Sequence, residues 1–248
     1  MKKTFSQKKS AFSLIELSIV LIVIGLLIAG ITGGASLIKS SELRSVMGEA
    51  RGYAVATNAF YTQYNNLPGD FKTSLGAAGT TGNSYGDGDG QIEFCADTGC
   101  SAALVATGSE GSIAWQHLKF AGGIDTAPTF LGGGADSLVV GTHLPASKIK
   151  SAGWGIDYNS TSSQNVVVLT GSTTAAASTT LSLVNGTTIS KGVITPSDAL
   201  SIDAKIDDGA ANAGKVRGVL TDCSSGATYE VTETTKECAI SYQIDVNS

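Results

Sequence analysis

The chain has 248 residues, including 31 glycines, four prolines and only 15 % charged residues, a composition that argues against a helical bundle and favours a loop-rich domain containing β-strands. Its net charge is −5, and the first nine residues alone contain four lysines, so the remainder is more acidic than the total indicates. This charge distribution excludes an electrostatic basis for nucleic-acid binding.

The N-terminal region combines basic residues with a long apolar segment. Lys2, Lys3, Lys8 and Lys9 precede 22 residues without a charge, from Leu17 to Ile38. As a helix at about 1.5 Å per residue, this segment is about 33 Å long and matches the hydrocarbon core of a bilayer. Because basic residues stay on the cytoplasmic side, we expect the rest of the chain to be exported.

Three interpretations of this region differ in where the mature chain begins. A cleaved secretory signal would use the small residues around Gly33-Gly34-Ala35, although the apolar segment is longer than usual for a signal. A plain membrane anchor explains the length and the lysines. Neither explains Glu16, because an acid at the membrane-entering end costs free energy and indicates a function.

The third interpretation rests on Ala11-Phe12-Ser13-Leu14-Ile15-Glu16-Leu17, which resembles the prepilin cleavage and methylation motif of the type IV pilin family. Ala11 is the small residue before the cut, Phe12 is the aromatic that begins the mature chain, and Glu16 is its fifth residue. Gly25 also matches a glycine that such helices carry. Ala11 stands where the family usually has glycine, and Gly33-Gly34 replaces a helix-breaking proline.

The resemblance implies that the chain is a substrate and not an enzyme. A membrane peptidase would cleave between Ala11 and Phe12 and methylate the new amine of Phe12. The protein would then be a subunit of a type IV pilus or a type II secretion pseudopilus. It would wait in the bacterial inner membrane with its C-terminal domain outside the cytoplasm, in contact with lipid, with other pilin or pseudopilin subunits, and with an assembly platform and ATPase.

The expected fold class is α+β and pilin-like, with a long N-terminal hydrophobic helix packed on a C-terminal antiparallel sheet with disulfide-closed loops. Four parts are expected: a cleaved leader at 1–11, a transmembrane or filament-core helix at 12–38, an amphipathic continuation at 39–66 and an exported globular domain at 67–248. Apolar residues at three- and four-residue steps predict that the helix continues to Tyr64, and Asn65 to Gly69 should end it.

The exported domain shows weaker local patterns. Residues 72–112 have no period and predict a long loop, whereas 113–121 predicts a short helix. Thr195 as a cap and Pro196 at the first helical position predict a helix that ends near Ile206. Clusters of β-branched residues predict strands at 137–140, 166–170, 180–184, 216–221 and 239–246.

The four cysteines form two local pairs, Cys95 with Cys100 and Cys223 with Cys238. Four cysteines permit three connectivities, and the low entropy cost of closing short loops favours these two pairs. Disulfides in turn indicate an oxidising compartment. A CxxC zinc pattern is absent from the sequence.

Two acidic segments are candidate cation sites. Gly86 to Glu93 resembles the middle of an EF-hand loop, in which Asp87 and Asp89 would bind Ca²⁺. The opening and closing acids of that loop are missing, so a solvated turn remains an equal alternative. Asp203, Asp207 and Asp208 form a second cluster at a helix C-terminus, for which a solvated turn is the preferred interpretation.

Two other functional classes stay open as alternatives. One is a signal-anchored exported domain that binds a surface. The other is a secreted hydrolase, in which Ser84 of Gly-Asn-Ser-Tyr-Gly would be the nucleophile and His117 or His143 the base. That motif requires a preceding strand and a following helix, and Ser84 lies in a glycine-rich segment that predicts neither.

Overall fold

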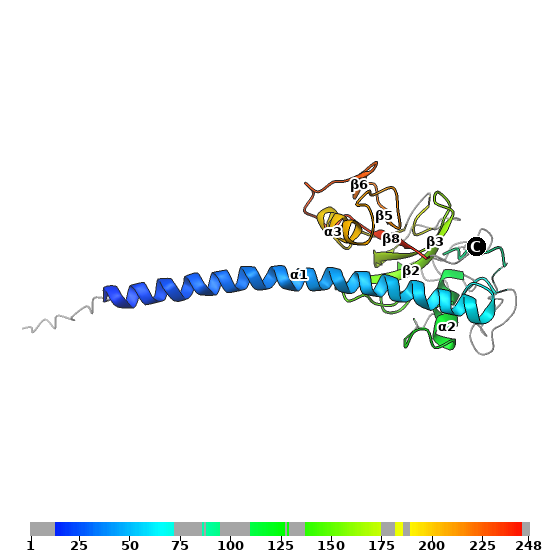
Figure 1. Ribbon diagram of the computed structural model, residues 1–248, viewed down its shortest axis with the longest axis horizontal. Coiled ribbons are helices and arrows are strands. Elements are labelled where there is room, and N and C mark those ends of the chain that lie inside the picture. Colours follow the sequence, from blue (N-terminus) through cyan, green and yellow to red (C-terminus); the bar gives the residue numbers. More distant parts are fainter. Residues whose placement is uncertain are drawn as a thin grey trace, which may run out of the picture. The chain divides into compact units, whose positions relative to one another are not determined.

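The computed structural model describes residues 13–71, 86, 88–94, 110–126, 128, 137–174, 182–185 and 189–244. Its fold is α+β, and its contacts form two compact units, one ending at Glu42 and one beginning at Leu43. The elements shown in Figure 1 are α1 (Leu14–Tyr64), α2 (Glu110–Phe120), β1 (Ser137–Leu138), β2 (Ala152–Asn159), β3 (Gln164–Gly171), β4 (Thr173–Thr174), α3 (Pro196–Ile206), β5 (Val216–Gly218), β6 (Ser224–Ser225), β7 (Thr228–Tyr229) and β8 (Ile240–Gln243).

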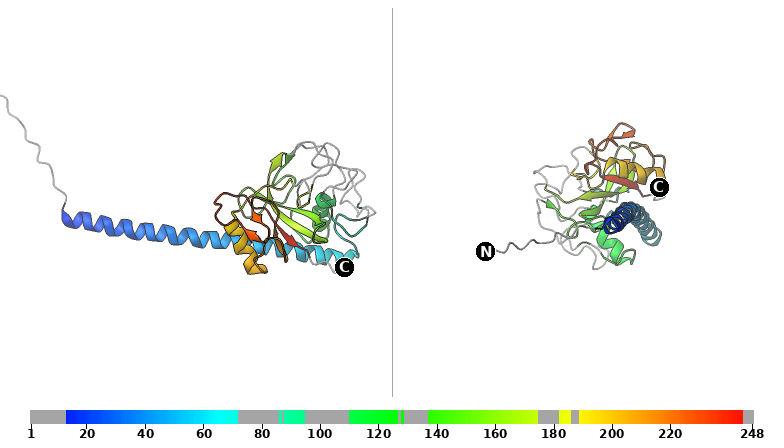
Figure 2. Two further views of the ribbon diagram at one scale, coloured as in Figure 1. Left: turned by 90° about the horizontal axis from the view of Figure 1, so that it is seen from above. Right: turned by 90° about the vertical axis from the view of Figure 1, so that its left-hand side faces the viewer.

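A four-stranded antiparallel sheet is the centre of the second unit. Its strand order is β2-β3-β8-β5, so the C-terminal strand β8 lies between β3 and β5. The strands stay together in both views of Figure 2. A four-residue turn joins β2 to β3, and in this turn the side-chain oxygen of Asn159 accepts hydrogen bonds from the backbone N–H groups of Thr161 (3.0 Å) and Ser162 (3.1 Å).

Strand β3 separates two hydrophobic clusters. Val167 and Leu169 belong to the larger cluster, whereas Val166 and Val168 belong to the smaller one. This division follows from the alternation of side chains along a strand, which sends neighbouring residues to opposite faces. Both faces of β3 are covered, and the strand therefore reads as a continuous apolar run instead of an alternating one.

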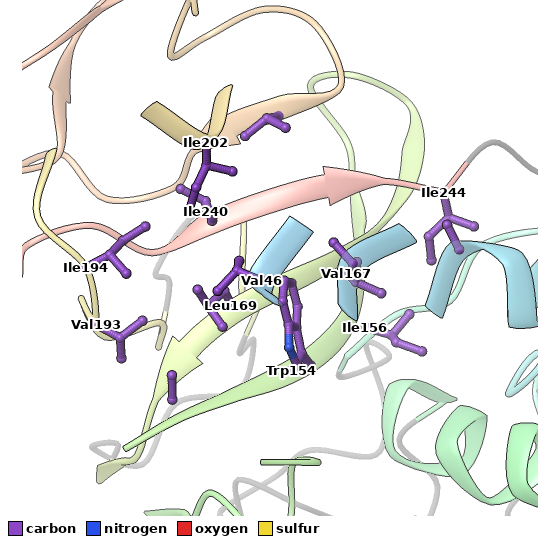
Figure 3. Close-up of a cluster of buried hydrophobic side chains, with 14 of the residues drawn as sticks. Val46, Trp154, Ile156, Val167, Leu169, Val193, Ile194, Ile202, Ile240 and Ile244 are labelled. Atoms are coloured by element: carbon purple, nitrogen blue, oxygen red, sulfur yellow. The ribbon is translucent and has the colours of Figure 1, made fainter. Parts of the chain in front are cut away.

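The part of α1 that begins at Leu43 contributes to the larger cluster. Val46 and Phe60 are each 1 % exposed, and Figure 3 shows Val46 beside Leu169 of β3 and Trp154 of β2. Ile202 of α3 lies in the same cluster. This half of α1 is therefore a core element of the sheet domain.

The helices agree well with the sequence-based predictions. Helix α1 ends at Tyr64, and Asn65 follows with a φ of 51°, a left-handed conformation that stops the helix. Helix α3 begins after Thr195, whose hydroxyl accepts a hydrogen bond from the backbone N–H of Asp198 in a capping box. Helix α2 starts at Glu110, so the expectation that the loop extends to residue 112 is wrong by one helical turn.

The strands agree less well. Residues 166–170 lie in β3 as predicted, and β1, β5 and β8 each occupy part of a predicted strand. The strand expected at 180–184 is wrong where the structure describes it, because Leu183 and Val184 lie in a bend after an isolated bridge at Ser182. The eight-residue strand β2 was not predicted at all.

Candidate functional site

The first half of α1 is the strongest candidate for a functional element. Its large apolar side chains from Leu14 to Ile38 are between 46 % and 89 % exposed, on all sides of the helix. The most apolar 18-residue window has a mean hydropathy of 2.8, and none of it is buried. By length and composition this helix can cross a membrane. A helix that is apolar all round requires a cover of lipid or protein.

Glu16 is the only ionisable residue between Leu14 and Ile38. Its Oε2 accepts a hydrogen bond from the backbone N–H of Ser13 at 2.9 Å, and the Ser13 hydroxyl accepts one from the backbone N–H of Ile15 at 3.3 Å. The carboxylate thus closes back on the start of its own helix, where the helix dipole favours negative charge. This local contact gives Glu16 a capping role that the sequence analysis missed, although Ser-x-x-Glu is a known capping signal.

Two uncharged polar side chains of the apolar segment, Ser18 and Thr32, are satisfied within the helix. The Ser18 hydroxyl donates to the carbonyl of Ile15 at 2.9 Å, and the Thr32 hydroxyl donates to the carbonyls of Ile28 and Ala29, each at 3.1 Å. Such internal hydrogen bonds make a hydroxyl tolerable in an apolar surrounding. Glu16 differs from Ser18 and Thr32 because it carries a charge.

Among the described residues, no atom packs closely against the glycines of this segment. A Cβ added at Gly25, Gly33 or Gly34 would meet nothing within 4 Å. The helix nevertheless continues through Gly33-Gly34, although each glycine weakens helix by about 1 kcal/mol relative to alanine. These glycines therefore leave room for a close approach that no described residue occupies. Ala11 and Phe12, the two residues of the expected cleavage site, lie outside the described residues.

The candidate calcium loop is held by residues that the sequence analysis did not identify. Asp70 is fully buried and accepts hydrogen bonds from the backbone N–H groups of Gly88 (2.5 Å) and Gly90 (2.9 Å). Asp89 accepts from the backbone N–H of Gln91 at 2.8 Å and from its side-chain amide at 2.5 Å. Asp87, the other predicted ligand, lies outside the described residues.

An open cleft of about 450 Å³ lies beside this loop, and its lining includes Asp89, Asn66 and Tyr158. Asn165 also lines the cleft and ties the loop to β3, since its Oδ1 accepts from the backbone N–H of Ile92 at 2.7 Å and its Nδ2 donates to the carbonyl of Gly90 at 3.1 Å. Asn165 lies 75 residues from Gly90, so no local pattern pointed to it. Calcium binding at this loop remains a prediction.

The second acidic cluster lies at the C-terminus of α3, as predicted. One potential ligand atom from each of Asp203, Asp207 and Asp208 lies within 4.8 Å of the others. Asp207 accepts from the backbone N–H of Lys215, and Asp208 accepts from that of Ala210 at 2.8 Å. The two exposed carboxylates therefore already accept hydrogen bonds from backbone N–H groups of the chain.

Asp203 is the buried member of this cluster. It accepts hydrogen bonds from the Tyr229 hydroxyl at 2.8 Å and from the backbone N–H of Gly209 at 3.2 Å. Burial raises the pKa of Asp203, and the charges of Asp208 and Asp207 add to this rise, while the two hydrogen bonds oppose it. Tyr229, which the sequence analysis missed, therefore supplies an uncharged hydroxyl donor to the buried carboxylate of the cluster.

The disulfide between Cys223 and Cys238 is confirmed, with the two Cα atoms 4.6 Å apart and both residues fully buried. It encloses the β6–β7 hairpin. Cys95 and Cys100 lie outside the described residues, so their pairing remains a prediction.

The two histidines of the hydrolase alternative have structural contacts. His117 is 3 % exposed, and its Nδ1 accepts a hydrogen bond from the backbone N–H of Gly69 at 2.9 Å. Nδ1 of His143 accepts one from the backbone N–H of Val139, also at 2.9 Å. Burial lowers the pKa of His117 to about 4. Ser84, the nucleophile of that alternative, lies outside the described residues.

Comparison with known proteins identifies no relative, since no protein-family model, curated protein or solved structure matches the chain.

Proposed function

We propose that this protein is a structural subunit of a type IV pilin-like filament, held in the membrane by the first half of α1 until it is assembled. The observation that carries this proposal is a helix that is apolar and exposed on all sides from Leu14 to Ile38, yet contains one acid, Glu16, next to its start. The motif from Ala11 to Leu17 supports the same assignment.

The apolar surface of this helix can be covered first by lipid and later by other subunits. In the membrane monomer, lipid covers the side chains between Leu14 and Ile38. In a filament, the same side chains pack against those of neighbouring copies, so the subunit exchanges a lipid cover for a protein cover. Gly25, Gly33 and Gly34 support this exchange, because none of the described residues packs against them.

Glu16 supports more than simple anchoring. Cleavage after Ala11 would leave a cationic amine on Phe12, and methylation preserves that charge. When subunits are staggered, the amine of one copy can meet Glu16 of its neighbour and neutralise two charges that are costly in an apolar environment. Apolar helix faces alone slide past one another easily, so this pairing would set the axial register.

The second half of α1 supports a mechanical role, because it is firmly attached to the sheet domain. The Glu49 carboxylate accepts hydrogen bonds from the Ser147 hydroxyl (2.6 Å), the Lys148 backbone N–H (2.9 Å) and the Trp154 indole N–H (3.0 Å). Burial, assisted by the charge of Glu49, raises the pKa of Tyr53 to about 12. A load on the helix would therefore reach the domain through a partly buried, hydrogen-bonded contact.

In this proposal the protein is not an enzyme. Its partners are other pilin or pseudopilin subunits, the peptidase that processes it, an inner-membrane platform, an ATPase and membrane lipid. The globular domain lies outside the cytoplasm, where the disulfide of Cys223 and Cys238 is stable.

The first test is the chemistry of the mature N-terminus. Mass spectrometry of protein isolated from a membrane should find a chain that begins at Phe12 with a methylated amine. A start near Ser36 would identify a secreted domain instead. Retention of Met1 would identify a plain anchor, and either result would refute the filament proposal.

The second test separates the charge of Glu16 from its capping role. Glu16→Gln keeps an oxygen that can accept from the Ser13 N–H but removes the charge, whereas Glu16→Leu removes both. Both variants should insert and be processed, yet fail to enter sheared filaments. Ser18→Leu, two residues away, is the matched control and should assemble normally. Normal assembly of Glu16→Gln would show that charge pairing is not the mechanism.

A further inference from the structure

A second open cleft, of about 480 Å³, lies at the end of β3 and gathers lysines from three separate segments. No carboxylate is among its lining residues, although the chain as a whole has more acids than bases. We name it the three-lysine cleft. It is lined by Lys150, Ser151, Ser172, Lys191, Gly192, Val193 and Lys236.

The backbone fixes the positions of two of these lysines. Lys150 lies in a turn that is closed by hydrogen bonds from Ser147 N–H to the Ala152 carbonyl (2.8 Å) and from Ala152 N–H to the Ile149 carbonyl (3.1 Å). The backbone N–H of Lys191 donates to the hydroxyl of Thr170 at 2.8 Å. Its carbonyl accepts from Gly171 at 3.1 Å, so Lys191 is attached to the end of β3.

The third lysine is held by the segment that contains the disulfide. Cys238 is bonded to Cys223, and its carbonyl accepts hydrogen bonds from the N–H groups of Val193 (2.9 Å) and Ile194 (3.3 Å). A Cβ at Gly192 would lie 2.2 Å from the Lys236 carbonyl oxygen, so only glycine allows the two segments to approach this closely. Lys191 and Lys236 are thus brought together by the fold and not by chance flexibility.

A hydroxyl adds a neutral donor to this cleft. The Ser172 oxygen accepts a hydrogen bond from the backbone N–H of Val140 at 3.0 Å. A serine hydroxyl has one hydrogen and two lone pairs, so this contact leaves its hydrogen for donation to a ligand. The lining therefore combines three lysines with a serine hydroxyl.

The chemistry of these groups indicates an anion with tetrahedral oxygens. Three ammonium groups that line one cleft repel one another, and a bound anion offsets this repulsion because it attracts all three. Lysine binds phosphate as a point charge, and a phosphoryl group with a charge of about −1.5 to −2 balances more of the three positive charges than a single carboxylate does. All three cations here are lysines, and the volume is in the range of small-ligand sites.

We propose that the three-lysine cleft binds the phosphoryl group of a small anionic ligand. Free phosphate esters and the headgroups of anionic phospholipids share this chemistry. The proposal does not depend on filament assembly, because it rests only on residues of the folded domain.

The experiment uses the full chain in a detergent without phosphate, with backbone amide NMR signals recorded during titration. The probes are inorganic phosphate, glycerol 3-phosphate and detergent micelles that contain phosphatidylglycerol, with micelles that contain phosphatidylcholine as the zwitterionic reference. The test variant replaces Lys150, Lys191 and Lys236 by Gln. The control variant replaces Arg51, Lys119 and Lys205 by Gln, which changes the net charge by the same amount at exposed positions elsewhere.

Saturable binding by wild type, with shifts centred on Gly192, is expected for at least one probe. The test variant should lose at least about tenfold in affinity, while the control stays within about twofold. Added salt should weaken binding. Binding of the soluble phosphates assigns a free phosphate ester as the ligand, and shifts with the phosphatidylglycerol micelles alone assign a lipid headgroup.

Four results would overturn the proposal. The first is that no probe binds, and the second is that both triple variants lose affinity equally. The third is that a DNA duplex binds while the small phosphates do not. The fourth is self-association that depends on the lysines, without phosphate binding. The last result would assign the cleft to a contact with a second copy of the chain.

Discussion

His117 makes the stability of the folded domain depend on pH in a way that can be calculated. Its ring is 3 % exposed and stacks on Phe60, with centroids 5.8 Å apart and ring planes 4° apart. Its Nδ1 already accepts the N–H of Gly69, so a proton on that nitrogen would place two donors against each other. Burial lowers the pKa of His117 to about 4 from the ordinary value of 6.5.

The sign and size of the effect follow from proton linkage. Below about pH 6.5 the unfolded chain binds a proton at His117 that the folded chain does not bind. The contribution of His117 to the free energy of unfolding is therefore fully present above this pH and is lost as the pH falls to about pH 4. The complete loss is about 3 kcal/mol, of which about 2 kcal/mol is already lost at about pH 5.

The assay is urea unfolding of the full chain in detergent, followed by circular dichroism at about pH 7 and about pH 5. His117→Asn keeps an acceptor near the position of Nδ1 but cannot titrate. It should reduce the difference in unfolding free energy between the two pH values by about 2 kcal/mol. Lost ring packing lowers stability equally at both pH values and cancels in this difference.

His143→Asn is the matched control, because its Nδ1 also accepts a backbone N–H but its side chain is only half-buried. It should change the pH dependence much less than His117→Asn. If His117→Asn shows the same pH dependence as wild type, the buried, unprotonated state of His117 is wrong.

Three further predictions concern other contacts of the domain. Glu49→Gln should lower the free energy of unfolding in urea by about 1 to 3 kcal/mol, because the new amide N–H₂ would face a group that donated a hydrogen bond to the carboxylate. The exposed control Glu233→Gln should change it by less than about 0.5 kcal/mol. Equal effects of the two variants would contradict the role of Glu49. Replacing Cys223 and Cys238 by Ser should cost about 2 to 5 kcal/mol, and a variant as stable as oxidised wild type would refute this. Millimolar calcium should raise the melting temperature of wild type but not that of Asp89→Asn. If wild type melts at the same temperature in calcium and in chelator, the loop binds no calcium.

Local sequence was sufficient where local interactions decide the structure. Thr195 and Pro196 start α3 because a cap and a fixed φ act within one turn. The disulfide of Cys223 and Cys238 follows from short loop closure. The apolar segment that ends at Ile38 and the position of Glu16 near its start can be read directly from the order of the residues. The candidate assembly helix could therefore be recognised from the sequence alone.

Strand β2 shows where local reasoning failed. Gly153 and Gly155 lower its strand propensity, yet both lie where other segments approach the strand closely. A Cβ at Gly155 would lie 2.2 Å from Cδ1 of Leu183, and one at Gly153 would lie 3.0 Å from the Pro145 carbonyl oxygen. The close neighbours of these glycines therefore lie in segments outside β2, which a local strand pattern does not include.

The tertiary structure alone decided how distant polar groups are paired. The predicted strand at 180–184 does not form in its described part, because the N–H groups of Leu183 and Val184 donate to the buried carboxylate of Asp157, at 2.6 and 3.3 Å. Asp70 holds the acidic loop, and three lysines from separate segments share one cleft. Sequence determined the elements whose hydrogen bonds and capping are local, whereas buried charges obtain their partners only when the chain is folded, because burial without partners is too costly.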